Sequence, residues 1–354
     1  MKIIVTILIL ISSLDAFSKE FEFSTQPFTE TYEVESSGDS ADDPAFWFNE
    51  KNPAESRVFG TDKNAGIFSY NLRGEVVQFI EAGGINNIDL RGYYKIGKEK
   101  FSILAGSNTD FNSIDLFLIS EDGNLVPFAN NSVDTDLKAI YGLCMFKNYK
   151  NKKTYIFVSD QESLTINQFE LSLLMPVTIK PVRVINIGSV SEGCVVDDFR
   201  SSLYYSQEDS GSGIFKITAD PLEPLQIIQI DSVDNGHIVG DAEGLSFIST
   251  SQGPLLIASS QGSSDFTVYS GDFPHDYLGR FSISSNDDID SVSKTDGIEA
   301  VVANLPAPFE NGIFITQDDE NTSSSGKKIN QNFKFTPLKP ILDNILSRIK
   351  KDNQ

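Results

Sequence analysis

The sequence is poor in the side chains on which many catalytic and binding sites depend. Its 354 residues include only two His, two Cys and one Trp. Two histidines, His237 and His275, cannot build a His-rich zinc or di-metal hydrolase site. Positive charge is also scarce, because 28 Lys and Arg face 50 Asp and Glu and leave a formal net charge of −22. This balance argues against binding to nucleic acid or to an anionic membrane surface.

Long apolar runs are absent except at the start of the chain. Residues 3–14 form an apolar run of roughly a dozen residues after Met1-Lys2, which is too short to span a bilayer. Ala16 and Ser18 are small residues at the positions that a signal peptidase reads. We therefore expect residues 1–18 to be a secretion signal peptide, cleaved near Ser18, with a buried N-terminal strand as the alternative. The mature protein is then periplasmic or secreted.

The two cysteines, Cys144 and Cys194, are too few for a disulfide framework. They fall at equivalent places in adjacent repeats of the sequence, so one bridge between those repeats is possible. We favour the other interpretation, two small buried apolar side chains, because free cysteine is among the most buried residue types.

The rest of the chain has the pattern of short β-strands. The apolar fraction of 40%, with 26 Phe and 11 Tyr, is enough for a large core. Short apolar or alternating runs, such as residues 66–70, 155–158 and 255–258, are separated by Gly, Asn, Asp and Ser. A helical pattern first appears near residue 338, so we expect residues 338–354 to form a C-terminal helix or tail.

A polar or acidic group followed by apolar residues recurs six times, at intervals of roughly 44 to 55 residues. The copies are Asp42-Asp43-Pro44-Ala45-Phe46, Asn87-Ile88-Asp89-Leu90, Tyr141-Gly142-Leu143-Cys144, Glu192-Gly193-Cys194-Val195, Glu243-Gly244-Leu245-Ser246 and Asp296-Gly297-Ile298-Glu299. Six such units predict an all-β fold over residues 19–337, a six-bladed β-propeller of four-stranded antiparallel blades around a central channel. An irregular β-sandwich or two small β domains are the alternatives.

In a propeller the six repeated groups begin the innermost strands and therefore gather at one mouth of the channel. We expect residues 21–34 to form a strand that pairs with the last blade and closes the ring, which removes free sheet edges. A single Asp in a turn is usually explained by local turn chemistry, but six copies at one rim are not. The polar residues that this arrangement brings to the rim are Asp42, Asp43, Asp89, Glu192, Glu208, Asp209, Asp241, Glu243, Gln261, Asp296, Glu299, Asp318 and Asp319.

So many carboxylates close together raise one another's pKa, and bound divalent cations remove that conflict. Oxygen ligands favour calcium over zinc or copper. The rim is therefore a candidate site for several calcium ions.

The same motifs resemble, in order, those of the β-propeller phytases, a family of calcium-dependent alkaline phytases. The resemblance runs from about Glu30 to Pro337. The motifs that carry it are Asp39-Ser-Ala-Asp-Asp-Pro-Ala-Phe-Trp47, Asn86-Asn-Ile-Asp-Leu-Arg91, Ser191-Glu-Gly193, Asp241-Ala-Glu-Gly-Leu245, Ala258-Ser-Ser-Gln-Gly262, Thr295-Asp-Gly-Ile298, Gln317-Asp-Asp-Glu-Asn321 and Asn330-Gln-Asn-Phe-Lys334.

The resemblance implies a phytase of the 3-phytase type. Such an enzyme hydrolyses phosphomonoesters of myo-inositol hexakisphosphate to lower inositol phosphates and orthophosphate, by attack of a calcium-bound water and without a covalent intermediate. The implied substrate is phytate or calcium-phytate, and we expect a monomer. The alternatives are a broader phosphomonoesterase, a lactonase-type propeller hydrolase, or a non-catalytic calcium-stabilised propeller that binds a ligand at the rim.

Matching motifs also imply roles for individual residues. The implied catalytic residues are Glu192, Asp241, Glu243 and Asp296, and the implied substrate-binding residues are Lys63, Arg91 and Tyr141. The implied metal ligands are Glu30, Asp42, Asp43, Glu192, Glu208, Asp241, Glu243, Gln261, Asp296 and Asp318. The surroundings of Glu30 diverge from the family pattern.

Three positions depart from that pattern, because Asn64, Thr109 and Gln161 stand where the family carries Lys, Arg and Lys. These positions belong to the binding of phosphate groups next to the one that is cleaved. We therefore predict weaker substrate binding or altered phosphate specificity, with hydrolysis retained.

Overall fold

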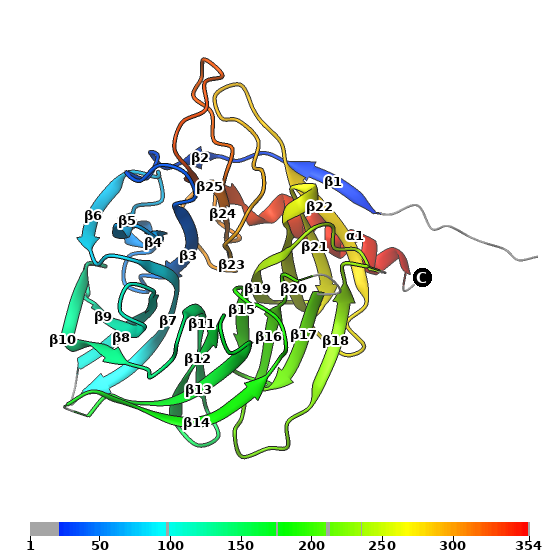
Figure 1. Ribbon diagram of the computed structural model, residues 1–354. Coiled ribbons are helices and arrows are strands. Elements are labelled where there is room, and N and C mark those ends of the chain that lie inside the picture. The colour runs from blue at the N-terminus through cyan, green and yellow to red at the C-terminus, as the bar shows by residue number, and fades with distance from the viewer. Residues whose placement is uncertain (1–20, 97–98, 175, 210–212, 235, 353–354) are drawn as a thin grey trace, which may run out of the picture.

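The computed structural model describes residues 21–96, 99–174, 176–209, 213–234 and 236–352. Six antiparallel sheets stand around a central axis, so the predicted six-bladed β-propeller is confirmed (Figure 1). The predicted signal peptide, residues 1–18, lies outside the described residues. No helix in the described part of the chain is long and apolar enough to cross a membrane.

The first three blades follow the chain in order from the innermost strand outward. Blade 1 has strands β3 (Ala41–Trp47), β4 (Arg57–Asp62), β5 (Gly66–Tyr70) and β6 (Val76–Glu81), with the short helix η1 (Pro53–Glu55) between β3 and β4. Blade 2 has β7 (Ile85–Ile96), β8 (Glu99–Asn108), β9 (Ser113–Ile119) and β10 (Leu125–Asp134). Blade 3 has β11 (Ile140–Asn148), β12 (Lys153–Asp160), β13 (Thr165–Ser172) and β14 (Thr178–Asn186).

The other three blades complete the ring. Blade 4 has strands β15 (Cys194–Asp197), β16 (Ser202–Ser206), β17 (Gly213–Thr218) and β18 (Ile227–Ser232). Blade 5 has β19 (Ala242–Thr250), β20 (Gly253–Ser260), β21 (Asp265–Ser270) and β22 (Tyr277–Ile283), with η2 (Gln261–Ser263) between β20 and β21. Blade 6 has β23 (Ile298–Val301), β24 (Ile313–Asp318) and β25 (Asn332–Pro337).

The N-terminal segment closes the ring in two places. Strand β2 (Thr29–Glu30) pairs antiparallel with β25 and is the fourth strand of blade 6, as expected for a closing strand. Strand β1 (Glu22–Thr25) instead pairs parallel with β22 and adds a fifth strand to blade 5. The segment therefore joins the last two blades rather than the last blade alone.

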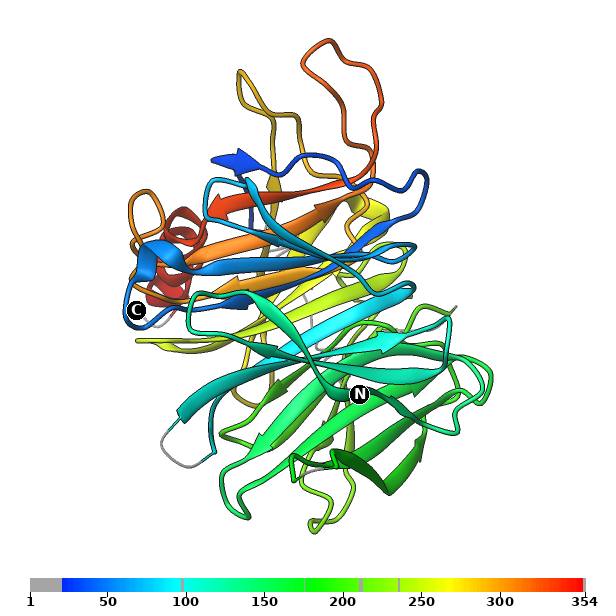
Figure 2. The ribbon, with the colours of Figure 1, turned by 90° about the vertical axis from the view of Figure 1, so that its left-hand side faces the viewer.

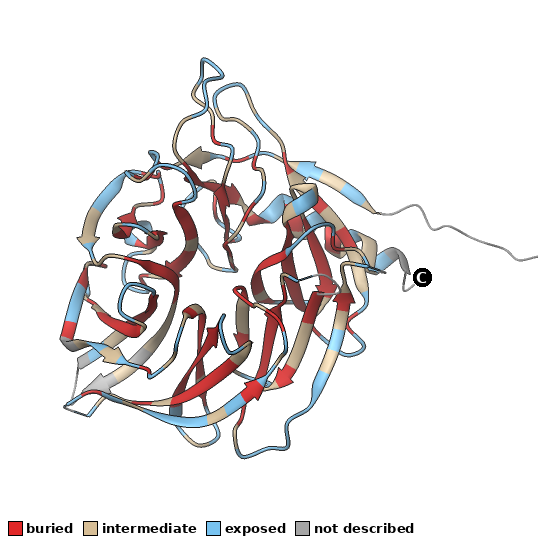
Figure 3. Cartoon of the chain, viewed as in Figure 1, coloured by how far each residue is buried: buried red, intermediate tan, exposed pale blue. Residues whose placement is uncertain are grey.

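The apolar core lies between adjacent blades. One cluster combines Ile103 and Leu116 of blade 2 with Met145 and Ile156 of blade 3, all with no exposed surface. Burying an aliphatic side chain of this size contributes about 1.5–3 kcal/mol, so each blade is stabilised mainly by its neighbours. Figure 3 shows the inner strands largely buried, whereas the outermost strands carry many exposed residues.

The chain ends in the helix α1 (Leu338–Asp352). Strand β25 runs away from the end of the ring where the inner strands begin, so α1 lies on the opposite face (Figure 2). Leu338, Ile341 and Ile345 are buried in the cluster between blades 5 and 6. The C-terminal segment is thus a packed part of the propeller.

Cys144 and Cys194 form a disulfide, with their Cα atoms 5.9 Å apart. They stand on β11 and β15, the innermost strands of blades 3 and 4. The favoured interpretation of two unpaired buried cysteines was therefore wrong, and the bridge between adjacent repeats is present.

Candidate active site

The innermost strands of blades 1, 2, 3 and 5 begin with an irregularity in their pairing. The register shifts between Ala41 and Pro44 in β3, Ile85 and Ile88 in β7, Ile140 and Leu143 in β11, and Ala242 and Leu245 in β19. A β-bulge of this kind takes residues out of the ladder and redirects their side chains. The first residue in each bulge is Asp42, Asn86, Tyr141 or Glu243, and Glu192 and Asp296 stand at the equivalent place in blades 4 and 6.

The glycine that follows four of these residues is required by close packing around the channel. A Cβ atom on Gly193 would lie 2.2 Å from the backbone oxygen of Glu243, and one on Gly297 would lie 2.5 Å from that of Asp42. Gly142 and Gly244 make the same approach to the next blade. Each glycine therefore lets the polar residue of the next blade come close to the one that precedes it, which brings the positions of blades 3, 4, 5, 6 and 1 together.

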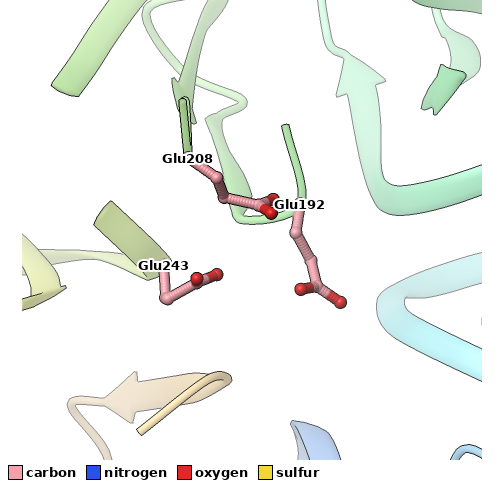
Figure 4. Close-up of side chains that lie close together, drawn as sticks. All are labelled: Glu192, Glu208 and Glu243. Carbon is pink, nitrogen blue, oxygen red and sulfur yellow. The ribbon is translucent and has the colours of Figure 1, made fainter. Parts of the chain in front are cut away.

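At this mouth of the channel lies a cavity of about 280 Å³. Figure 4 shows Glu192, Glu208 and Glu243 converging from blades 4 and 5, and one oxygen of each lies within 4.8 Å of the others. The residues that line the cavity are Asp39, Lys63, Tyr141, Glu192, Asp241, Glu243, Gln261, Lys294, Asp296 and Asp319. The lining therefore includes all four residues to which the sequence assigned catalysis, Glu192, Asp241, Glu243 and Asp296.

Hydrogen bonds orient the carboxylates of this cavity. The hydroxyl of Tyr141 donates to Oε2 of Glu192 at 2.6 Å, and the side-chain amide of Asn86 donates to Oε1 of the same residue. The side-chain amide of Gln261 donates to Oδ1 of Asp296 at 2.6 Å. Glu192, at the start of blade 4, is consequently held by the adjacent blade 3 and by blade 2 beyond it.

Burial and mutual repulsion raise the pKa of several carboxyl groups in the cluster. Burial first, and then the charge of Glu192, raise the pKa of Glu208 to about 8 and that of Asp296 to about 7. The same two causes raise the pKa values of Asp42 and Glu243 well above their ordinary range. Without a counter-charge the protein holds part of this cluster protonated near neutral pH.

Lys63 is a basic residue beside these carboxylates. Burial opposes its charge, but Asp42 and Glu192 outweigh that effect and raise its pKa. Its Nζ lies 2.7 Å from Oδ1 of Asp39, and its side chain is 15% exposed. Lys63 therefore stays protonated and offers N–H donors at the cavity wall.

Four carboxylate oxygens in this cluster are buried and have no hydrogen-bond partner. They are both oxygens of Asp42, Oε1 of Glu208 and Oε2 of Glu243. Buried polar atoms without partners are rare because each costs free energy. An all-oxygen set of this kind fits a hard cation such as calcium. The residues present at the mouth are therefore suited to hold calcium.

Two predicted site residues lie deeper in the channel. Arg91 and Asp43 line a second cavity of about 90 Å³, together with Asp89 and Glu299. Arg91 donates from Nη1 to Asp89 at 2.7 Å and from Nε to Asp198 at 2.9 Å. Its position on β7 explains this placement, because five residues of strand after Asn86 carry it about 16 Å along the channel. Arg91 does not line the cavity at the mouth.

Asp318 and Glu30 also lie apart from that cavity. Asp318 is fully buried at the end of β24 and forms an ion pair with Lys334, which also binds Asp290. Glu30 accepts a hydrogen bond from the side-chain amide of Asn332 at 2.9 Å. Asp319, the residue after Asp318, lines the cavity instead.

The three departures from the family pattern are all exposed side chains outside the cavity lining. Thr109 donates its hydroxyl to the backbone oxygen of Gly84 at 3.0 Å. Asn64 donates from its side-chain amide to the backbone oxygen of Asp39 at 3.3 Å. The weaker substrate binding or altered phosphate specificity expected from these three departures stays a prediction.

Asn86, Asp39 and Lys294 belong to this site although the sequence had not singled them out as site residues. Asn86 could have been found by aligning the repeats one residue earlier in blade 2, because it occupies the bulge position of Asp42 and Glu243. Asp39 stands within a recognised motif, but no spacing marks it as the partner of Lys63. Lys294 carries no sequence signal of its own.

The fold occurs in distant solved structures. The GH93 α-L-arabinofuranosidase of Fusarium graminearum matches with a TM-score of 0.56 at 11% identity, over 89% of this chain and 99% of that one. The α-L-arabinanase of Penicillium chrysogenum matches with a TM-score of 0.53 at 12% identity, again over 89% and 99%. At such identities the likeness shows the fold alone.

Sequence relationships show the family. The model of the phytase family matches residues 2–354. The curated 3-phytase of Bacillus subtilis (strain 168) is 32% identical over 339 residues, which are 93% of this chain and 87% of that protein. These findings confirm the resemblance inferred from the ordered motifs. The chain belongs to the phytase family and is a phosphoric monoester hydrolase.

Proposed function

We propose that the protein is a calcium-dependent phytase that hydrolyses phosphomonoesters of myo-inositol hexakisphosphate to lower inositol phosphates and orthophosphate. The observation that carries this proposal is the group of buried, unpartnered oxygens of Asp42, Glu208 and Glu243 beside the cavity. An acidic cavity repels a polyanionic substrate unless cations occupy it. Bound calcium would offset the negative charge of the cavity, so that inositol hexakisphosphate, itself a polyanion, can bind there.

Several acidic residues and one amide would hold the cations at the mouth. These are Asp42, Glu192, Glu208, Asp241, Glu243, Gln261 and Asp296. When bound, calcium supplies charge neutralisation for the carboxylates, binding of phosphate oxygens and activation of the attacking water. Glu192, Asp241, Glu243 and Asp296 are the proposed catalytic residues, because they line the cavity in which the phosphate would react.

Lys63 and Tyr141 are the proposed contacts to the phosphate that is cleaved. Lys63 remains charged beside Asp42 and can donate to a phosphate oxygen. Burial, followed by the charge of Glu192, raises the pKa of Tyr141, so its hydroxyl stays protonated. Its single hydrogen is donated to Glu192 here, and it would turn to a phosphate oxygen when Glu192 binds a cation. We assign Arg91 to the channel network with Asp89 and Asp198, rather than to the phosphate.

We also propose that the protein acts after export, as a monomer, in the periplasm or outside the cell. The predicted signal peptide is one support for this proposal. The disulfide between Cys144 and Cys194 is an independent support, because structural disulfides persist in oxidising compartments. The exported protein would then bind dissolved phytate or calcium-phytate in that compartment.

The test is phosphate release from inositol hexakisphosphate by the purified full chain, with calcium and with an excess of chelator. We expect turnover that requires calcium and returns when calcium is added back. A calcium titration of the melting temperature should run in parallel, since a ligand that binds only the folded state stabilises it. Undiminished turnover in chelator contradicts calcium dependence. A melting temperature that rises with calcium without any phosphate release points to the non-catalytic propeller.

A further inference from the structure

Lys294 is a second basic residue on the wall of the cavity at the mouth. Among the described residues that line the cavity, Lys63 and Lys294 are the lysines, and no arginine joins them. Lys63 comes from the turn between β4 and β5 in blade 1, whereas Lys294 comes from the connection between β22 and β23. The two cations therefore approach the cavity from different blades.

The two lysines differ in their surroundings. Lys63 is mostly buried and lies among Asp42, Glu192 and Asp296. Lys294 is exposed, and its Nζ pairs with Oε1 of Glu320 at 2.7 Å, where the two side chains are 54% and 50% exposed. An exposed ion pair of this kind contributes little to stability. Lys294 can therefore exchange Glu320 for a ligand phosphate at small cost.

The backbone of Lys294 is held in place although its side chain reaches solvent. Its φ is 44°, in the left-handed region, and its N–H donates to the hydroxyl of Ser264 at 3.1 Å. Two residues later, Asp296 is fixed by a hydrogen bond from its N–H to the side-chain oxygen of Gln317 at 2.9 Å. Lys294 thus has a backbone held at the rim and a charged end that is exposed to solvent.

Other cations near the rim do not take this role. Lys138 pairs with Glu162 on blade 3 and is not part of the cavity lining. Positions 109 and 161, where the family pattern has positive charge, hold the neutral residues Thr109 and Gln161. In this cavity a substrate with several phosphates finds one positive charge at Lys63 and a second at Lys294, which precedes the first strand of blade 6.

We propose that Lys294 is a specificity-determining residue that binds a phosphate group next to the one being hydrolysed, and so favours polyphosphorylated substrates over simple phosphomonoesters. The inference rests on the proposed function, because it concerns which phosphate ester the site prefers. Lys63 serves the phosphate at the carboxylate cluster, and Lys294 serves its neighbour. A monoester with one phosphate makes the first contact and lacks the second.

The experiment compares Lys294→Gln with the unchanged protein, both full-length and in calcium. KM and kcat are measured for inositol hexakisphosphate and for p-nitrophenyl phosphate. We expect KM for inositol hexakisphosphate to rise about 3- to 10-fold, with kcat within about twofold, because one charge-assisted contact is lost. KM for p-nitrophenyl phosphate should stay unchanged, and Lys294→Arg should restore most of the affinity.

Lys150→Gln is the matched control. Lys150 also forms an exposed pair with a glutamate, Glu223, at 2.8 Å, but it lies at the far end of β11 from Tyr141. The same loss of one positive charge there should leave both KM values unchanged. If Lys294→Gln leaves KM for inositol hexakisphosphate unchanged, or raises both KM values equally, the proposal is overturned.

A binding measurement separates this inference from the proposed function. Calorimetry with inositol hexakissulfate, a polyanion that the reaction does not consume, should show about a 3- to 10-fold weaker Kd for Lys294→Gln than for the unchanged protein. A protein that binds the hexakissulfate but releases no phosphate contradicts the proposed function, and Lys294 is still judged by the Kd. Equal Kd values for the two proteins overturn the role of Lys294.

Discussion

At the scale of single residues, Glu192 is the centre of the site. It accepts hydrogen bonds from Tyr141 and Asn86, and its charge contributes to the raised pKa values of Glu208 and Asp296. It is also one of the three glutamates whose oxygens converge. One side chain thus connects the hydrogen-bonded wall of the cavity to the group of unpartnered oxygens.

Glu192→Gln should therefore abolish most turnover without unfolding the propeller. The substitution keeps the shape of the side chain and an acceptor for Tyr141, but it removes the negative charge that a cation requires. Metal-assisted stabilisation of several kcal/mol corresponds to at least about 100-fold in kcat/KM. Steady-state kinetics in saturating calcium and circular dichroism measure the two effects.

A suitable control is Glu223→Gln, since Glu223 pairs with Lys150, beyond the end of β11 that is far from Tyr141, and the variant should retain full activity. Full activity in Glu192→Gln would refute the proposed site. Asp296→Ala should also lose most turnover, because Asp296 lines the same cavity.

At the scale of elements, the starts of the inner strands position the site. The bulges in β3, β7, β11 and β19 lift polar residues out of the ladder, and the glycines let neighbouring strands approach closely. The disulfide between β11 and β15 ties two of these strands a few residues from Tyr141 and Glu192. Close packing and one covalent bond together keep the mouth in shape.

Replacing both Cys144 and Cys194 by Ala should lower the free energy of unfolding by about 2 to 4 kcal/mol. The bridge closes a loop with a sequence separation of 50 residues, and opening it increases the entropy of the unfolded chain. Urea unfolding of the variant and of the unchanged protein, both in calcium, measures the difference. The unchanged protein in reductant is the control and should lose a similar amount. Equal stability in all three samples would show that the bridge contributes nothing.

At the scale of the whole molecule, the formal charge of −22 is partly collected at one mouth. The ring places carboxylates from all parts of the chain around one cavity, where burial and repulsion raise their pKa values. Without calcium, the carboxyl groups of the cavity resist ionisation, and those that are ionised repel a polyanion. With calcium the same carboxylates become the support of an anion-binding surface.

The calcium-free protein should lose stability as pH rises from about 5 to 8. Burial and Glu192 raise the pKa of Glu208 from 4.5 to about 8 and that of Asp296 from 3.8 to about 7. The folded state therefore keeps protons that the unfolded chain has already released, and stability is lost as pH rises through the folded pKa. We expect a decrease on the order of a few kcal/mol, levelling off above about pH 8.

Urea unfolding in chelator at pH 5, 6.5 and 8 measures this decrease. In saturating calcium the decrease should be absent or reversed, because the cation replaces the protons and binds the ionised carboxylates. A chelated protein whose stability rises over this range would contradict the proposed cluster.

By itself the sequence determined the number of repeats, the closed all-β architecture and the family, because period and motif order are properties of the chain. It also determined that acidic residues meet at one mouth. The tertiary structure alone decided that Asp319 rather than Asp318 lines the cavity, that Arg91 lies deeper in the channel, and that Lys294 joins the site. The physical reason is strand register: a shift of one residue turns a side chain to the other face of a strand, and bulges interrupt that alternation.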